Sequence, residues 1–469
     1  MYRHSPNSHD DLTIETYLPP LEPGILAGKN VRTILMNAKV YARHRKQLIR
    51  MIGEGGIAIL PAAPVRVRNR DVEYPFRQDS DFLYLSGFPE PEAVIVLLPG
   101  RKNGEFILFC RDKNEEQEVW HGRRCGPEGA IEKYAADDAF PIDDIDDILP
   151  GLMEHCDRVY HTMGLDPQFD KQVMNWVNTL RKQSRSGGSV PYEFVSLDYL
   201  LHDMRLFKSR DELRLMKKAA KISVEAHKKA MHLCRPGLNE YHLDAEIMYE
   251  FQRNGATWAY PSIVGGGANS CILHYTENNM PLNDGDLVLI DAGCEYEGYD
   301  ADITRSFPVN GKYSAAQKEI FDLVVQANLA GIKQVKPGNH WNDPHEAAVK
   351  VITKGLIELG LLKGNLSKLI KDEAYKKYYM HRTGHWLGMD VHDVGDYKVD
   401  DGWRLLEAGM VLTIEPGLYI PHGSRGAKRW WDIGVRIEDD VVVTRDGCEV
   451  LTQGLPKTTE EIEAIMAAE

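Results

Sequence analysis

The carboxyl-terminal half of the chain contains an internal repeat, which restricts the fold more than any other feature of the sequence. Residues 285–293 (GDLVLIDAG) match residues 409–417 (GMVLTIEPG), and each segment places an acid six positions after one glycine and two before another. Upstream, residues 234–237 (CRPG) and 335–338 (VKPG) each separate two segments with helical character. Two matches in the same order indicate a duplicated helix–helix–strand unit, so we expect two halves related by a pseudo-twofold axis.

The amino-terminal half has a different pattern, in which short apolar strands alternate with helices. Residues 36–53 are typical of an amphipathic helix that ends at Gly53. Strands are predicted at 57–60, 93–98 and 106–109, and helices around 127–136, 143–153 and 168–183. This alternation predicts a mixed α/β domain.

The boundary between the two parts is predicted from a linker and a helix start. Residues 184–189 (SRSGGS) have the composition of a linker, and Ser209 with Glu212 forms a capping box that opens a long helix. We therefore predict an extension at 1–35, an amino-terminal α/β domain at 36–204 and a catalytic domain at 205–469. A chain of 469 residues is long enough for two hydrophobic cores.

Charge and cysteine content exclude several functional classes. The net charge of −14 argues against a nucleic-acid partner, and bound cations could neutralise part of it. No apolar run reaches the roughly 18 residues that a membrane span needs, and the first thirty residues lack the apolar stretch of a secretory signal. Seven cysteines without a C-x-x-C pair indicate buried free thiols and a cytoplasmic location.

Acidic residues at strand ends are the candidates for chemistry. The apolar run in the first copy of the repeat ends at Asp291, and Asp302 opens the next strand. Glu415 occupies the position of Asp291 in the second copy. Residues 434–443 are predicted to form one strand with Arg436 and Glu438 on the same face.

A glycine-rich segment, 381–395, adds three histidines at positions 381, 385 and 392. Four carboxylates and one imidazole make an oxygen-rich ligand set that suits two divalent cations, whose charge of +4 would offset the four acids. Manganese or cobalt fits this donor set, with zinc as the alternative. Each acid alone is more often a solvated surface residue, so the prediction depends on the joint pattern.

The joint pattern resembles the pita-bread metallopeptidases, and specifically their Xaa-Pro aminopeptidase (aminopeptidase P) branch. In the catalytic half it matches at 271–278 (CILHYTEN), 289–294 (LIDAGC), 302–305 (DITR), 385–395 (HWLGMDVHDVG), 413–419 (TIEPGLY) and 435–439 (VRIED). In the amino-terminal half it matches at 73–82 (EYPFRQDSDF), 86–93 (SGFPEPEA) and 120–124 (WHGRR). One departure is Arg382, which follows the first histidine of the cluster where many relatives have glycine.

The resemblance implies a role for each site residue. The dinuclear metal ligands would be Asp291, Asp302, His385, Glu415 and Glu438. His274 and His392 would hydrogen-bond the scissile carbonyl and its developing oxyanion, and His381 would lie beside the substrate. The resemblance also implies a homo-oligomer, dimer or tetramer, in which Trp120 contacts the proline ring across a subunit boundary, with Asp71 and Arg185 near that entrance.

The chemistry expected of such a site is hydrolysis of the bond before a proline. A metal-bridging hydroxide would attack the carbonyl of residue one, and Glu415 would pass the water proton to the leaving prolyl nitrogen. Arg436 would hold a ligand carboxylate or a substrate group, with a structural ion pair as the equal alternative. Tyr419 would donate its hydroxyl near the site, or else be a core tyrosine.

Two other functions stay open from the sequence alone. A prolidase would have the same ligands and a similar two-domain plan but would cleave only Xaa-Pro dipeptides. A catalytically silent pita-bread protein would bind partners, although such proteins lose ligand residues and this chain keeps all five. Methionine aminopeptidase and creatine-hydrolysing relatives are disfavoured, the first because it lacks such an amino-terminal domain and the second because it dispenses with the metal ligands.

Overall fold

The computed structural model describes residues 38–183, 189–424, 426 and 428–468. The predicted extension at 1–35 and Arg185, within the predicted linker, lie outside the described residues. In the described ranges no helix is both long and apolar enough to cross a membrane.

The amino-terminal part is built on a six-stranded mixed sheet in the order β6-β5-β4-β1-β7-β8. Its strands are β1 (Gly56–Pro61), β4 (Val94–Leu97), β5 (Phe106–Cys110), β6 (Asp138–Pro141), β7 (Arg158–Tyr160) and β8 (Glu193–Val195). Strands β1, β4 and β5 are antiparallel neighbours, whereas β6, β7 and β8 join the sheet in parallel. The predicted mixed α/β character is confirmed.

Alternation of side chains along these strands divides the apolar residues between the two faces. On one face, Ile57, Val94 and Phe109 join a core with α5 (Ile145–Met153) and α6 (Pro167–Gln183). Helix α1 (Ala38–Ile52) packs on β1 and on α2 (Ser80–Ser86), and the Arg45 guanidinium lies 4.0 Å over the Phe106 ring. Further elements are β2 (Val67–Asn69), β3 (Val72–Glu73), α3 (Glu115–His121), α4 (Gly126–Tyr134) and the 3-10 helix Ile142–Asp144.

Helix α7 (Asp198–Leu206) leads into the long helix α8 (Arg210–Leu233). The predicted capping box is present, because the Ser209 hydroxyl accepts from the Glu212 amide and the Glu212 carboxylate accepts from the Ser209 amide. Arg205, in α7, is 3% exposed and donates to Asp390 and Asp393 of the second part at 2.7 and 2.6 Å. The boundary at 204/205 stays a prediction.

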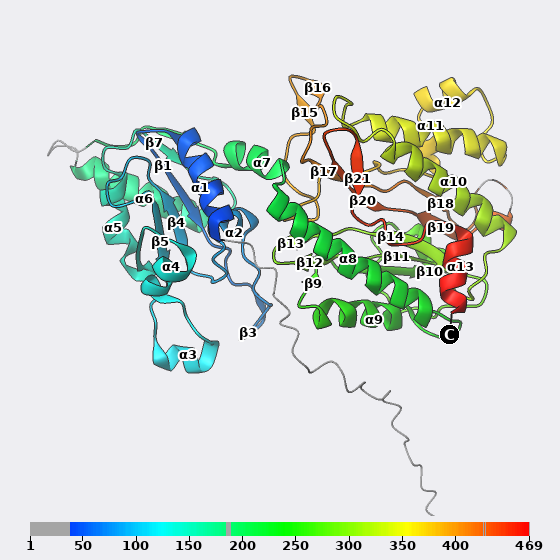
Figure 1. Ribbon diagram of the computed structural model, residues 1–469, viewed down its shortest axis with the longest axis horizontal. Helices are drawn as coiled ribbons and strands as arrows, with labels where there is room; N and C mark the ends of the chain where they lie inside the picture. The colour runs from blue at the N-terminus through cyan, green and yellow to red at the C-terminus, as the bar shows by residue number, and fades with distance from the viewer. Residues whose placement is uncertain (1–37, 184–188, 425, 427, 469) are drawn as a thin grey trace, which may run out of the picture. The chain divides into compact units, whose positions relative to one another are not determined.

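The second part contains the predicted duplication. Helices α8 and α9 (Glu240–Arg253) form one packed pair, and α10 (Ala315–Ile332) and α11 (Asp343–Glu358) form the other (Figure 1). Gly237 and Gly338 both have positive φ in the turns between paired helices, a conformation that favours glycine. Their amides donate to Leu282 and Leu406, equivalent positions ahead of the two repeated strands.

Each helix pair is followed by an antiparallel sheet. The first sheet has the order β10-β11-β14, from Ile263–Gly266, Leu287–Asp291 and Thr304–Pro308. The second has the order β17-β20-β21, from Val411–Ile414, Asp439–Val443 and Cys448–Val450. A two-stranded sheet of β18 (Gly417–Ile420) and β19 (Ile433–Arg436) continues beyond it.

The predicted single strand at 434–443 is wrong, because Ile437 and Glu438 interrupt it. The facing strand is interrupted as well, at Glu415 and Pro416, where proline has no amide hydrogen for a sheet. At the break, the Glu438 amide donates to the Thr304 carbonyl at 3.1 Å and so joins the second half to the first. The two breaks therefore free both acids from the ladders.

The remaining elements are short or peripheral. The strands are β9 (Thr257–Trp258), β12 (Cys294–Tyr296), β13 (Tyr299–Asp300), β15 (Lys398–Val399) and β16 (Gly402–Trp403), and the helices are α12 (Leu366–Lys371) and α13 (Thr459–Ala467). Three 3-10 turns occupy Gly267–Cys271, Ala374–Lys377 and Lys428–Trp430.

Candidate metal centre

The five predicted ligand side chains line one cavity of about 400 Å³. Asp291 ends β11, Asp302 lies two residues before β14, Glu415 follows β17 and Glu438 precedes β20, while His385 lies in the segment between the 3-10 turn Ala374–Lys377 and β15. The lining also includes Tyr260, His274, His381, Arg382, His392 and Arg436. The structure thus brings together residues that are more than 140 positions apart in the sequence.

Strand register explains why the acids converge. Asp291 pairs with Thr304 across β11 and β14, and Ile414 pairs with Asp439 across β17 and β20. Two glycines allow the close approach of backbones at these ends. A Cβ atom at Gly293 would lie 1.7 Å from the Ala301 carbonyl oxygen, and one at Gly384 would lie 2.0 Å from that of Thr413. No side chain fits at either position.

His385 lies against two of the carboxylates. Its Nε2 is 3.3 Å from Asp302 Oδ2 and 3.8 Å from Glu415 Oε1. Its Nδ1 donates to the Trp386 carbonyl at 2.9 Å, which turns Nε2 toward the acids. One ligand atom each from Asp302, His385 and Glu438 lies within 4.8 Å of the others. This spacing fits donor atoms around a cation.

An outer set of hydrogen bonds holds the ligands. Arg436 Nη2 donates to Asp291 Oδ2 at 2.6 Å and its Nε donates to Thr304 Oγ1 at 3.1 Å. Thr304 Oγ1 in turn donates to Glu438 Oε2 at 2.5 Å. The Tyr260 hydroxyl donates to Asp291 Oδ1 at 2.7 Å and also contacts Asp302. Arg436 therefore pairs with the Asp291 carboxylate, and its predicted role of holding a metal ligand or a substrate group stays a prediction.

Tyr260 is a site residue that the sequence analysis missed. It follows β9 in a segment without regular structure, so neither strand alternation nor the repeat marks it. The sequence around Tyr260 contains no motif that would connect this residue with Asp291.

The ionisation of the site reflects crowding of like charges without a bound cation. Burial and the neighbouring acids raise the pKa of Glu438 well above its usual range, and burial raises the pKa of Glu415 to about 7. Burial lowers the pKa of His385, but Asp302 and Glu415 outweigh it and raise that pKa to about 9. Burial would raise the pKa of Asp302, but hydrogen bonds from His385 and Tyr260 hold it low.

The donor set fits divalent metal ions. Four carboxylates and the His385 imidazole form the donor set in the cavity, and Arg436 is the only buried arginine among its described lining residues. One guanidinium cannot balance four ionised acids, so without further positive charge some must hold protons. Two divalent cations would supply that charge and find oxygen-rich ligands.

The three other histidines and Tyr419 surround this centre. His274 and His392 line the cavity and are exposed, and the His392 ring lies 4.3 Å from that of His385. His381 Nδ1 donates to the Arg382 carbonyl, so its Nε2 accepts from the Tyr419 hydroxyl at 2.9 Å. Tyr419 is fully buried, and its hydroxyl oxygen accepts from Arg436 Nη1 at 2.9 Å. The same hydroxyl thereby links Arg436 to His381.

The predicted entrance residues lie on other elements. Trp120 is 77% exposed on α3, a helix without a buried residue, and Asp71 is exposed in the turn between β2 and β3. Neither is among the residues that line the cavity, and Arg185 is outside the described residues. The roles of Trp120, Asp71 and Arg185 stay predictions.

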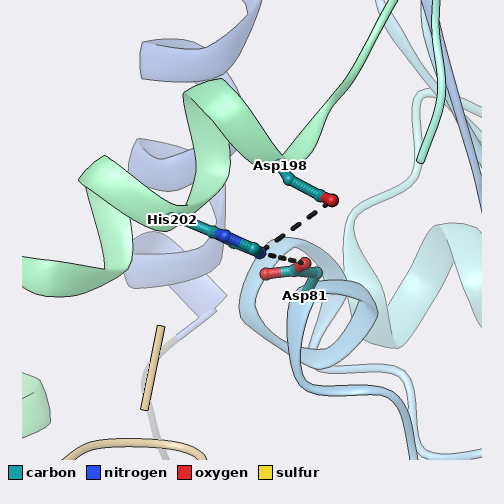
Figure 2. Close-up of side chains that lie close together, drawn as sticks. All are labelled: Asp81, Asp198 and His202. Carbon is teal, nitrogen blue, oxygen red and sulfur yellow. Dashed lines mark ion pairs between the residues drawn. The ribbon is translucent and has the colours of Figure 1, made fainter. Parts of the chain in front are cut away.

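A second group of potential ligands occurs in the amino-terminal part, where Asp81, Asp198 and His202 point toward one another (Figure 2). His202 Nε2 is 3.8 Å from Asp81 and 3.9 Å from Asp198. Asp81 already accepts from Arg205 at 2.9 Å, and Asp198 accepts from Thr162. A cation here would meet the Arg205 guanidinium, so the group is better explained as an ion-pair network between α2 and α7.

Comparisons with known proteins agree with this geometry. Residues 214–445 match the model of metallopeptidase family M24, and residues 41–160 match that of the aminopeptidase P N-terminal domain. The Xaa-Pro aminopeptidase of Escherichia coli is 45% identical over 430 residues, which cover 91% of this chain and 97% of that protein.

Solved structures show the same fold. The aminopeptidase PepP of Pseudomonas aeruginosa superimposes with a TM-score of 0.92 at 59% identity, covering 92% of this chain and 99% of that one. A zinc-substituted aminopeptidase P of E. coli in complex with product has a TM-score of 0.90 at 44% identity, covering 92% and 98%.

Proposed function

Because the chain belongs to metallopeptidase family M24, we propose that it is a metallo-aminopeptidase that releases the N-terminal residue from peptides with proline at the second position. The observation that carries this proposal is the convergence of all five donor side chains, from both halves of the repeat, on one cavity. The relatives at 44–59% identity that cover nine-tenths of the chain are aminopeptidases of this kind. A silent scaffold would not need to keep all five donors.

We assign the metal ligands as Asp291, Asp302, His385, Glu415 and Glu438. Bound divalent ions would lower the pKa of a water molecule and polarise the scissile carbonyl. Manganese is the proposed metal because carboxylate oxygens dominate the donor set, with cobalt or zinc as alternatives. A zinc-substituted form of the E. coli aminopeptidase P supports a centre that accepts more than one ion.

The remaining side chains bind and move protons. Glu415 faces the cavity beside His385 and is assigned the transfer of a proton from the attacking water to the leaving prolyl nitrogen. His274 and His392, exposed at the cavity wall, are assigned the hydrogen bonds to the scissile carbonyl oxygen. Arg436 and Tyr419 act behind them, where they fix Asp291 and His381.

Proline fits this wall because its nitrogen carries no hydrogen to be satisfied. Ile263, Leu273 and Val391 supply apolar surface in the cavity for the ring. A further wall would come from Trp120 of a second copy, with Asp71 and Arg185 near the entrance. An indole that is 77% exposed on a helix without a buried residue supports a homo-oligomer in which this helix is covered. A cytoplasmic location remains part of the proposal.

A paired assay tests the function. The purified full chain, loaded with Mn²⁺, should release alanine from Ala-Pro-Ala, and chelation should stop the reaction. Ala-Ala-Ala should be a poor substrate. Turnover of the dipeptide Ala-Pro without turnover of the tripeptide would establish a prolidase instead, and no turnover with bound metal would favour a binding protein.

A further inference from the structure

Arg382 is a cation at the rim of the catalytic cavity that the proposed mechanism does not use. The residue lines the cavity and its side chain is exposed, whereas the five ligands lie deeper. Its φ is not positive, so an arginine adopts this backbone without strain.

The guanidinium is held in place by an aromatic platform. It lies 5.2 Å from the ring centre of Trp341 and 4.9 Å from that of Trp403, and it donates to Asn342 Oδ1. The backbone on both sides is fixed as well, since the Arg382 carbonyl accepts from His381, and buried Thr383 contacts both His345 and Tyr379. An arginine ordered in advance loses little entropy when it binds a ligand.

Among the described residues, no carboxylate oxygen lies within 4.0 Å of the Arg382 guanidinium as an ion-pair partner. Arg436, the other arginine in the cavity, is buried and already bound to Asp291. The guanidinium of Arg382 makes cation–π contacts and one hydrogen bond to a neutral amide. Its other N–H groups can therefore donate two parallel hydrogen bonds to an anion.

We propose that Arg382 forms a carboxylate-binding subsite for the part of the peptide beyond the proline. The inference rests on the proposed aminopeptidase activity, in which the amino end of the substrate occupies the deep end of the cavity at the metal ligands. The remainder of the peptide then leaves through the rim, where Arg382 stands. Its ligand is a carboxylate: the C-terminal group of a short peptide or an acidic side chain just after the proline.

Charge balance gives this subsite a purpose. The centre is rich in carboxylates. Any negative charge there that bound cations do not neutralise would repel a carboxylate on the substrate. A guanidinium between that anion and the centre converts the repulsion into attraction. Hydrogen bonds between charged groups at such a rim correspond to a preference on the order of tenfold.

Four peptides test the inference and separate the two sources of carboxylate. The wild-type chain loaded with Mn²⁺ should cleave Ala-Pro-Ala about tenfold more efficiently, in kcat/KM, than Ala-Pro-Ala-amide if the terminal carboxylate binds. It should prefer Ala-Pro-Glu-amide over Ala-Pro-Gln-amide by a similar factor if the acidic side chain binds. In Arg382→Gln the preference should fall to about one, with the neutral peptides changed less than about threefold, while Arg382→Lys should keep part of it.

A matched control comes from the same platform. Lys398 lies 4.7 Å over the Trp403 ring but is not a lining residue of the cavity, so Lys398→Gln should keep the wild-type preference. The wild type also gives a test without variants: Pro-Ala should inhibit about tenfold more tightly than Pro-Ala-amide if the terminal group is the ligand.

The outcomes separate cleanly. Equal turnover of all four peptides by the wild type would overturn the subsite while leaving the aminopeptidase intact. An equal loss for all four in Arg382→Gln would assign the residue a purely structural part and also refute the subsite. Failure of the wild type to cleave any of them would remove the proposed function, and the inference with it.

Discussion

Replacing Arg436 by methionine removes the buried cation that the metal-free centre depends on. The guanidinium is 4% exposed and donates to the Asp291 carboxylate, to the Tyr419 hydroxyl and to Thr304. All three bonds have a charged donor, and breaking such a buried ion pair by removing one partner costs about 3–5 kcal/mol. At about 2 °C per kcal/mol for a catalytic half of this length, that cost lowers Tm by roughly 6–10 °C.

The assay is unfolding of the metal-stripped protein, followed by tryptophan fluorescence, for wild type and Arg436→Met. Arg429→Met is the control, because Arg429 pairs with Glu319 at 2.8 Å on the surface and its loss should cost under about 1 kcal/mol. The cost of Arg436→Met should shrink as pH falls, since protonated acids no longer need a counter-charge. A cost below about 1 kcal/mol, or one independent of pH, would refute the argument that charge, and not packing, fixes Arg436.

Four further predictions follow from the same contacts. Glu415→Ala and Asp302→Ala should each abolish turnover and lower metal content, and full activity in either variant would refute the ligand assignment. Tyr260→Phe should weaken metal binding about 10–100-fold with the fold intact, measured by chelator competition, because a donor to two ligands is lost; unchanged affinity would remove Tyr260 from the site. The pKa of Glu415 is raised from 4.5 to about 7 and that of His385 from 6.5 to about 9, and both shifts have the same consequence: the metal-stripped protein loses stability, and its metal affinity increases, as pH rises from about 4.5 to about 9. A flat profile in titration calorimetry would contradict it. The cysteines, five buried and two half-buried, should resist alkylation at neutral pH, because burial raises the pKa of thiols such as Cys234 to about 12; rapid inactivation by iodoacetamide would show otherwise.

The repeat indicated where two of the acids lie, because residues at equivalent positions of a duplicated unit occupy equivalent positions of the backbone. Equal spacing of Asp291 and Glu415 from flanking glycines placed both acids at equivalent strand ends, and the registers of β11 and β17 confirm that placement. Asp302, His385 and Glu438 have no counterpart in the repeat, and the resemblance to a known family is what singled them out as ligands. Short apolar runs between turn residues predicted β1, β4 and β5, because strands buried on both faces need apolar side chains at every position.

Contacts between segments that share no pattern were beyond the sequence. The strand break at Ile437 was missed because residues 434–443 alternate as one strand, and only the facing Pro416 and the amide bond to Thr304 open it. The Tyr260 hydroxyl reaches acids that tertiary structure alone brings near. The predicted role of Trp120 requires a second copy of the chain against α3, and a single sequence carries no pattern that places such a copy.

The distribution of ligands over the polypeptide has a consequence for biosynthesis. Asp291 and Asp302 leave the ribosome more than 80 residues before His385, and Glu438 follows His385 by 53 residues. A nascent chain therefore cannot assemble all five donors until residue 438 has been translated. Uptake of the ions would then report that both halves of the repeat have been synthesised and have paired.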